Sequence, residues 1–124
     1  MVFRPRGVFS EKRIRTLVKM LDAAEREAAK PFNRFSDFSQ LFAVDVDMEA
    51  VLRVSLHRQT AYATRAPVKS AFYVPTAAVA RVAKIHSLVM ESSYLSVKVF
   101  ESIGKAARWL RVPKEMLALD PTAP

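Results

Sequence analysis

The residues of this chain that could transfer protons or bind a metal are few and widely spaced. His57 and His86 are the only histidines, and there is no cysteine, so thiolate chemistry is excluded. The two histidines do not form a close ligand pair of the kind that zinc sites use. His86 falls on the apolar side of an expected helix, which favours a histidine satisfied within the core, whereas His57 is expected to be exposed beside Arg58. We therefore expect no metal and no cofactor.

Nucleophile motifs and paired acid–base residues are also missing. The chain has no G-x-S-x-G segment, and a Ser-His-Asp triad cannot be inferred from residue order because it is defined by geometry. Gly7 and Gly104 are the only glycines, which argues against a glycine-rich loop around a phosphate group. The sequence therefore predicts a protein that is not an enzyme.

Three aspartates lie where they could cap a turn or contact a ligand. Asp37 is near the end of an expected strand, where ligand crevices of parallel sheets form, although capping a turn is the favoured role. Asp45 and Asp47 precede an expected helix and are candidates for its N-cap. Their alternation also suggests a cation site, but the glycine and the distant glutamate of an EF-hand are missing, so capping is favoured.

Positive charge dominates the chain, with 20 Lys and Arg against 12 Asp and Glu, a net charge of +8 and a pI near 10.2. No acidic residue lies between Glu49 and Glu91. Such a field attracts anions of many kinds, including nucleic acid, anionic lipid and acidic proteins, although a solvated surface is the simplest interpretation. The residues that we expect to contact a protein partner or an anion are Arg53, His57, Arg58, Arg65, Lys69 and Arg81.

The secondary structure that positions these residues is clearest in the second half of the chain. Ser70–Val74 is an almost continuous apolar run, which predicts a strand covered on both faces. Thr76 is expected to cap the following helix. Leu95–Val99 alternates apolar and polar residues, which predicts a strand with one exposed face near the edge of a sheet. Ser102 is expected to cap the last helix, and Pro113 opposes its continuation.

The first half repeats this alternation of strands and helices. The helix after Asp47 is expected to bury Met48, Val51, Leu52 and Ser55 and to turn its basic residues outward. The expected elements are a short strand within Val2–Phe9 that Pro5 either confines to a sheet edge or breaks, a helix over Glu11–Ala29, a strand over Phe32–Ser39, a connection or short strand over Gln40–Val46, a helix over Met48–Tyr62 and a loop over Thr64–Val68.

These elements predict a single α/β domain over residues 1–113, with a four- or five-stranded, mostly parallel sheet and about four helices. Residues 114–124 are expected to form one helical turn and a frayed tail. No apolar run approaches the roughly 20 residues of a membrane span. The N-terminus lacks the apolar segment of a secretory signal, and the absence of cysteine is compatible with a reducing compartment, so we expect a cytoplasmic protein.

The segments VKSAFYVP, LSVKVFES and KAARWLRV, together with RFSDFSQL and VDVD, resemble the bacterial STAS-like proteins related to anti-sigma-factor antagonists, and the SpoIIAA-like group in particular. The resemblance extends from about Gly7 to Val112. It implies a mixed sheet of four or five strands with helices packed against it, and a regulatory role without catalysis. The phosphorylated serine of that family is missing, because this chain reads Asp45-Val46-Asp47-Met48 at the corresponding place. A phosphorylation switch is therefore not implied.

Two functions follow from these observations. The first is a regulatory or protein-interaction domain that acts through a protein partner or self-association, with Arg53, His57 and Arg58 on the contact helix. The alternative is binding of an anionic or lipid-like small ligand through a basic-rimmed pocket, which requires a deep apolar cavity. Nucleic-acid binding is not expected, because no recognised motif supports it.

Overall fold

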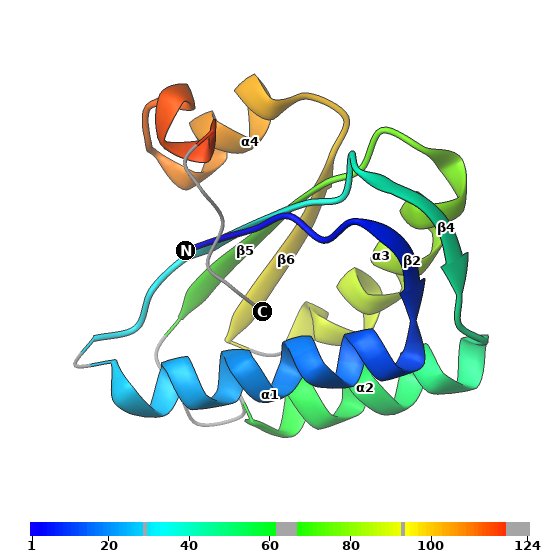
Figure 1. The fold of residues 1–124 in the computed structure, drawn as a ribbon. Helices are drawn as coiled ribbons and strands as arrows, with labels where there is room; N and C mark the ends of the chain where they lie inside the picture. Colours follow the sequence, from blue (N-terminus) through cyan, green and yellow to red (C-terminus); the bar gives the residue numbers. More distant parts are fainter. Residues whose placement is uncertain (29, 62–66, 93, 119–124) are drawn as a thin grey trace.

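The computed structural model describes residues 1–28, 30–61, 67–92 and 94–118 and shows an α/β fold in three layers (Figure 1). Helices α1, α2 and α3 cover one face of the central sheet, and α4 with the short helix η2 covers the other. The elements are β1 (Val2–Phe3), β2 (Gly7–Ser10), α1 (Glu11–Glu27), β3 (Arg34–Asp37), β4 (Leu41–Asp45), α2 (Met48–Ala61), β5 (Val68–Tyr73), α3 (Ala77–Val89), η1 (Met90–Ser92), β6 (Leu95–Phe100), α4 (Ile103–Leu110) and η2 (Lys114–Ala118).

The central sheet has the strand order β1-β3-β5-β6, and each neighbouring pair is parallel. The predicted α/β class, with a mostly parallel sheet and about four helices, is confirmed. The mixed sheet that the family resemblance implied is not observed among the described strands, since β2 and β4 also pair in parallel. As expected, β5 lies inside the sheet and β6 lies at its edge.

The N-terminal strand is divided at Pro5, as the sequence predicted. Its first part, β1, forms an edge of the central sheet, whereas its second part, β2, pairs with β4 in a separate two-stranded sheet. Gly7 makes this change of direction with φ of 77°, a left-handed conformation that strains residues with a side chain. The short strand allowed within Gln40–Val46 is therefore present as β4.

The strand predicted over Phe32–Ser39 is shorter, and its alternation separates two environments. Phe35 is buried in a cluster with Ala71 of β5 and with Ala106, Ala107 and Leu110 of α4. Phe38 belongs to the cluster on the opposite face, beneath α1 and α3. Because alternate residues of a strand face opposite sides, Arg34 and Ser36 lie on the face of Phe38, under the helices.

Caps define the ends of the helices. The Ser10 side chain accepts a hydrogen bond from the amide of Arg13 at the start of α1, and Ser102 accepts one from Lys105 at the start of α4. Thr76 occupies the predicted N-cap position of α3, but its side chain makes no capping hydrogen bond. The helical turn predicted after Pro113 is present as η2.

The buried face of α2 differs from the prediction. Val51 and Ser55 are buried as expected, but Met48 and Leu52 are 45% and 40% exposed, and Arg58 is only 2% exposed. The helix is rotated so that Arg58 points inward, where acidic residues of α1 compensate its charge.

One other predicted segment differs, because Val68 begins β5 and is not part of a loop. Tyr62, Arg65 and the C-terminal tail after Ala118 lie outside the described residues.

Candidate functional site

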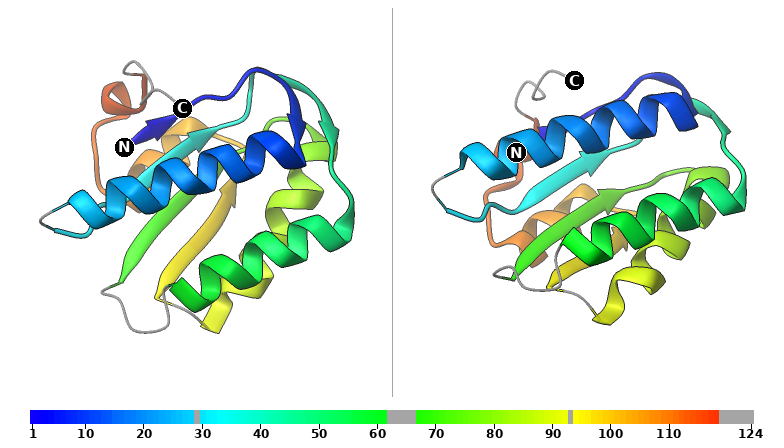
Figure 2. Two further views of the ribbon diagram at one scale, coloured as in Figure 1. Left: turned by 60° about the horizontal axis from the view of Figure 1, so that its bottom comes forward. Right: turned by 90° about the horizontal axis from the view of Figure 1, so that it is seen from below.

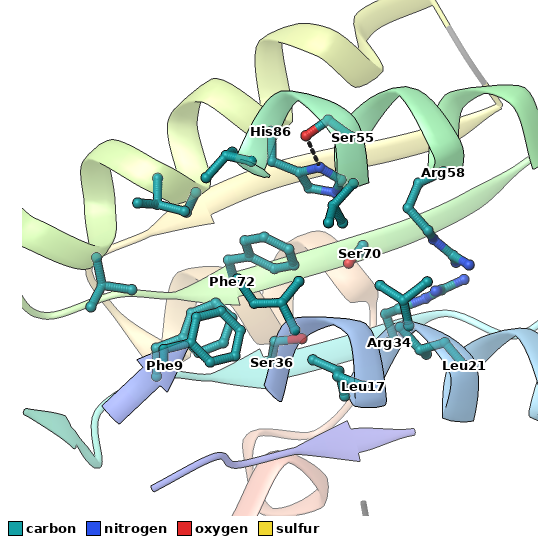
Figure 3. Close-up of a pocket in the computed structure, with 18 of the residues that line it drawn as sticks. Phe9, Leu17, Leu21, Arg34, Ser36, Ser55, Arg58, Ser70, Phe72 and His86 are labelled. Atoms are coloured by element: carbon teal, nitrogen blue, oxygen red, sulfur yellow. Dashed lines mark hydrogen bonds between the residues drawn. The ribbon is translucent and has the colours of Figure 1, made fainter. Parts of the chain in front are cut away.

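A cavity of about 100 Å³ lies between the central sheet and the helices α1, α2 and α3 (Figure 3). It is smaller than the engineered apolar cavity of about 150 Å³ that binds benzene. The apolar residues that line it are Phe9, Ile14, Leu17, Val18, Leu21, Phe38, Val51, Val54, Phe72, Val79, Val82, Ala83 and Leu95.

The floor of the cavity consists of two small polar residues from neighbouring strands. Ser36 of β3 and Ser70 of β5 are 5% and 2% exposed, and both line the cavity. Neither hydroxyl has a hydrogen-bond partner among the residues that the structure describes. A larger apolar side chain at either position would fill part of this space, and each serine instead presents a polar hydroxyl to the cavity.

Two arginines lie at one end of the cavity, and Figure 3 shows their guanidinium groups close together. Nη1 of Arg34 lies 3.0 Å from Oε1 of Glu25, and Nη2 of Arg58 donates to the same oxygen at 2.6 Å. Arg58 also donates through Nη1 to Oδ1 of Asp22 at 2.5 Å. Two cations therefore meet two carboxylates, and three of these four side chains are at most 6% exposed.

His86 of α3 lines the cavity above the sheet. Its Nδ1 is 2.8 Å from the hydroxyl of Ser55 on α2, and its ring stacks on Phe72 with a centroid distance of 5.8 Å and an interplanar angle of 6°. Burial, followed by the positive charges of Arg58 and Arg34, lowers the pKa of His86 to about 4. The imidazole is therefore neutral at pH 7, as expected for a histidine satisfied within an apolar face.

The structure places the predicted contact residues of α2 on two different sides. Arg53 and His57 are exposed, and Arg53 donates to Glu11 at 3.0 Å while His57 lies 3.3 Å from Asp22. The expectation that Arg58 also faces outward is wrong, because its guanidinium is enclosed between α1 and the sheet.

The other predicted contact residues do not join this group. Lys69 lies on the face of the sheet that α4 covers, where its ammonium donates to the carbonyl of Trp109 at 2.9 Å and sits 5.3 Å from the centre of the indole. Arg81 is exposed on α3, and Arg65 lies outside the described residues. The five described residues therefore do not form one continuous basic patch.

Two of the three aspartates have structural partners. Asp47 accepts a hydrogen bond from the amide of Ala50 at 2.8 Å, which confirms its role as the N-cap of α2, whereas Asp45 is the exposed last residue of β4. Asp37 accepts from the Ser39 amide and from Arg4, each at 2.9 Å. Burial raises the pKa of Asp37, but these hydrogen bonds and the charge of Arg4 outweigh burial, so the net pKa is lowered. Within the described residues, no three His, Asp or Glu side chains gather as a metal-binding group.

Sequence reasoning missed the polar residues of the cavity. Arg34 and Ser36 were treated as part of an ordinary strand, and Ser70 as part of an apolar run. A signal was present, because Arg34 and Ser36 fall on the same face of the expected strand as Phe32 and Phe38. The acidic partner on α1 could not be identified from spacing, because it is distant in sequence.

Comparisons with protein-family models, with curated proteins and with solved structures find no match for this chain. The resemblance to STAS-like proteins therefore stays a prediction. No helix in the described part of the chain combines the length and the apolar character that crossing a membrane requires.

Proposed function

We propose that this chain is a non-enzymatic binding protein that holds a small, lipid-like ligand in the cavity between the sheet and helices α1–α3. The observation that carries the proposal is the combination of apolar walls with the buried, partnerless hydroxyls of Ser36 and Ser70. A void and an unsatisfied hydroxyl each destabilise a core, so a sequence under selection for stability alone favours apolar residues at these positions. A bound ligand offsets both costs.

A groove on the outer surface offers a route to this cavity. It lies between α1 and α2, and both the groove and the cavity are lined by Val18 and Val54. Figure 2 shows α1 and α2 side by side with β3 and β5 visible between them. The charged residues along the groove are Glu11, Arg15, Lys19, Asp22, Arg53 and His57. Three of these residues are cationic, namely Arg15, Lys19 and Arg53, but Glu11 and Asp22 also line the groove, so its rim carries both signs of charge.

The Ser55–His86 hydrogen bond is a poor basis for catalysis. A histidine with a pKa of about 4 is a weak general base at pH 7. The charged groups that shift this pKa are the guanidinium groups of Arg58 and Arg34, and cations disfavour the imidazolium ion that a serine nucleophile requires as its partner. The pair therefore supports a structural role for Ser55.

Native mass spectrometry of the purified protein tests the proposal when it is compared with a variant whose cavity is filled. Ala83 is 3% exposed and lines the cavity, so Ala83→Leu places additional carbon atoms in the space. We expect an additional small mass on the wild-type protein that is missing from the variant. Apo masses alone in both purified proteins would contradict the proposal.

A second candidate function, self-association, is favoured by the outer face of α2. Met48, Leu52 and Leu56 are 45%, 40% and 54% exposed and lie four residues apart, so they form one apolar line along the helix. The line is symmetric about Leu52. Two copies of α2 packed in antiparallel orientation therefore place Met48 against Leu56 and Leu52 against its own equivalent, which is the self-complementarity that a two-fold dimer requires.

Sedimentation velocity over a range of protein concentrations tests this second function. We expect a dimer that Leu52→Asp converts to a folded monomer, because Leu52 is 40% exposed and its substitution removes an apolar contact between copies without disturbing the core. Lys84→Ala, a change at an exposed position of α3, serves as the control and should leave the dimer intact. A wild-type protein that stays monomeric at every concentration rules the dimer out.

A further inference from the structure

We infer that the cavity selects a small ligand with a neutral hydrogen-bonding group, such as a hydroxyl or an amide, and excludes carboxylates and phosphates. This inference rests on the proposed function and specifies its ligand class. It differs from the expectation that the net charge of +8 suggests, which is an anionic ligand. The charges of the residues that line the cavity decide whether a neutral or an anionic ligand is favoured.

The arginines that line the cavity are already matched by carboxylates. Arg34 and Arg58 both contact Glu25, and Arg58 also contacts Asp22, so two positive charges meet two negative charges at this end. A ligand carboxylate placed here adds a third negative charge to a buried group of four. Because the desolvation of an ion costs several kcal/mol, an anion without a free cationic partner is disfavoured.

Apart from Nε of Arg34, a buried donor that makes no hydrogen bond to a described residue while the same guanidinium contacts Glu25, the polar groups that remain for a ligand are uncharged. Ser36 and Ser70 each offer a hydroxyl that can donate and accept, and the second ring nitrogen of His86, Nε2, has no partner among the described residues. Arg34 pairs with Ser70, and Ser36 pairs with Phe72, so the two serines are diagonal neighbours on adjacent strands. A single ligand group between them is within reach of both hydroxyls.

The volume of about 100 Å³ is below the roughly 150 Å³ of a cavity that binds benzene, so it restricts the apolar part of the ligand to at most one six-membered ring or a short alkyl chain. Phe38 and Phe72, whose ring centroids are 5.3 Å apart in an edge-to-face arrangement, form part of this apolar region. An aromatic ring with one hydroxyl satisfies both the apolar walls and the serine floor.

Isothermal titration calorimetry at pH 7 with toluene, phenol and benzoate separates these requirements, because the three molecules share a ring and differ in one substituent. We expect the wild-type protein to bind toluene and phenol and to show no detectable binding of benzoate. Ser36→Ala and Ser70→Ala should each weaken phenol about five-fold, the equivalent of one hydrogen bond, and leave toluene unchanged. Ser96→Ala, at an exposed position of β6, is the matched control and should change neither affinity.

The outcomes distinguish this inference from the proposed function. Benzoate binding as tight as phenol binding, toluene binding without phenol binding, or an equal loss for toluene and phenol in the serine variants would each overturn the neutral-ligand inference and leave the binding cavity in place. If none of the three molecules binds the wild-type protein, both the inference and the proposed function are wrong.

Discussion

His86 is neutral at pH 7 because burial and two neighbouring guanidinium groups disfavour the imidazolium ion, and this makes folding sensitive to pH. The unfolded chain binds a proton at this histidine near its ordinary pKa of 6.5, whereas the folded protein does so only at about 4. Between these values the unfolded state binds more protons. Stability is therefore fully present above pH 6.5 and is lost as the pH falls towards 4.

Urea denaturation at pH 7 and pH 5 measures this effect. We expect the wild-type free energy of unfolding to fall by about 2 kcal/mol between these values, because the pKa of the folded state is about 4. His86→Phe keeps the stacking on Phe72 and removes the titrating group, so its stability should be nearly constant over this interval. His57→Gln, a change at an exposed position, should retain the wild-type decrease. An equal decrease in His86→Phe would show that another group is responsible.

At the residue scale, the sequence was sufficient to predict the position of a polar side chain only where that position depends on a local pattern. His86 was placed correctly because its helix has a regular apolar face. The N-cap at Asp47 was predicted because it depends only on adjacent residues. Arg58 was placed on the wrong face because its partners, Asp22 and Glu25, belong to a different helix and no local pattern reveals them.

At the scale of secondary-structure elements, ion pairs join α1 to α2. Arg53 of α2 bonds to Glu11 near the start of α1, and Arg58 bonds to Asp22 and Glu25 further along. Val18 and Val54 lie on the same two helices, between these ion pairs in sequence, and line both the groove and the cavity. The ion pairs therefore hold α1 and α2 together on either side of the proposed route to the cavity.

These two ion pairs should differ strongly in their contribution to stability. Arg58 is 3% exposed, so Arg58→Ala removes a buried cation from Asp22 and leaves Glu25 with Arg34 alone, and it should reduce the free energy of unfolding by about 3–5 kcal/mol. Arg53 is 56% exposed, and solvent screens its pairs, so Arg53→Ala should leave the urea midpoint almost unchanged. Chemical denaturation of both variants under the same conditions makes the comparison. Equal effects would show that Arg58 is not a buried structural charge.

At the scale of the whole molecule, the alternation of strands and helices was sufficient to predict the α/β class and the mostly parallel sheet. The α/β class and the parallel sheet both follow from the spacing of apolar residues within short segments, and this spacing can be read directly from the sequence. The separate β2–β4 sheet was not predicted, because it depends on the turn around Pro5 and Gly7. The cavity was raised only as a requirement of the ligand hypothesis, since voids result from the packing of residues that are distant in sequence.

The structure separates two surfaces with different properties, which the charge distribution alone did not reveal. The cavity lies beneath α1, α2 and α3, whereas the apolar line of Met48, Leu52 and Leu56 faces outward from α2. Ligand binding and self-association therefore use different sides of one helix. A change in the α1–α2 contact can influence both, because α2 takes part in each.

Methyl NMR spectra recorded during a toluene titration test the central claim most directly, since they locate the bound molecule. We expect the largest shifts at methyl groups that line the cavity on three helices, those of Ile14, Val54 and Val79, and no shifts at Leu56, whose side chain faces solvent. Saturable shifts confined to these cavity methyls would establish an accessible binding cavity. Unchanged cavity methyls at saturating toluene, or shifts only along the exposed face of α2, would contradict the account.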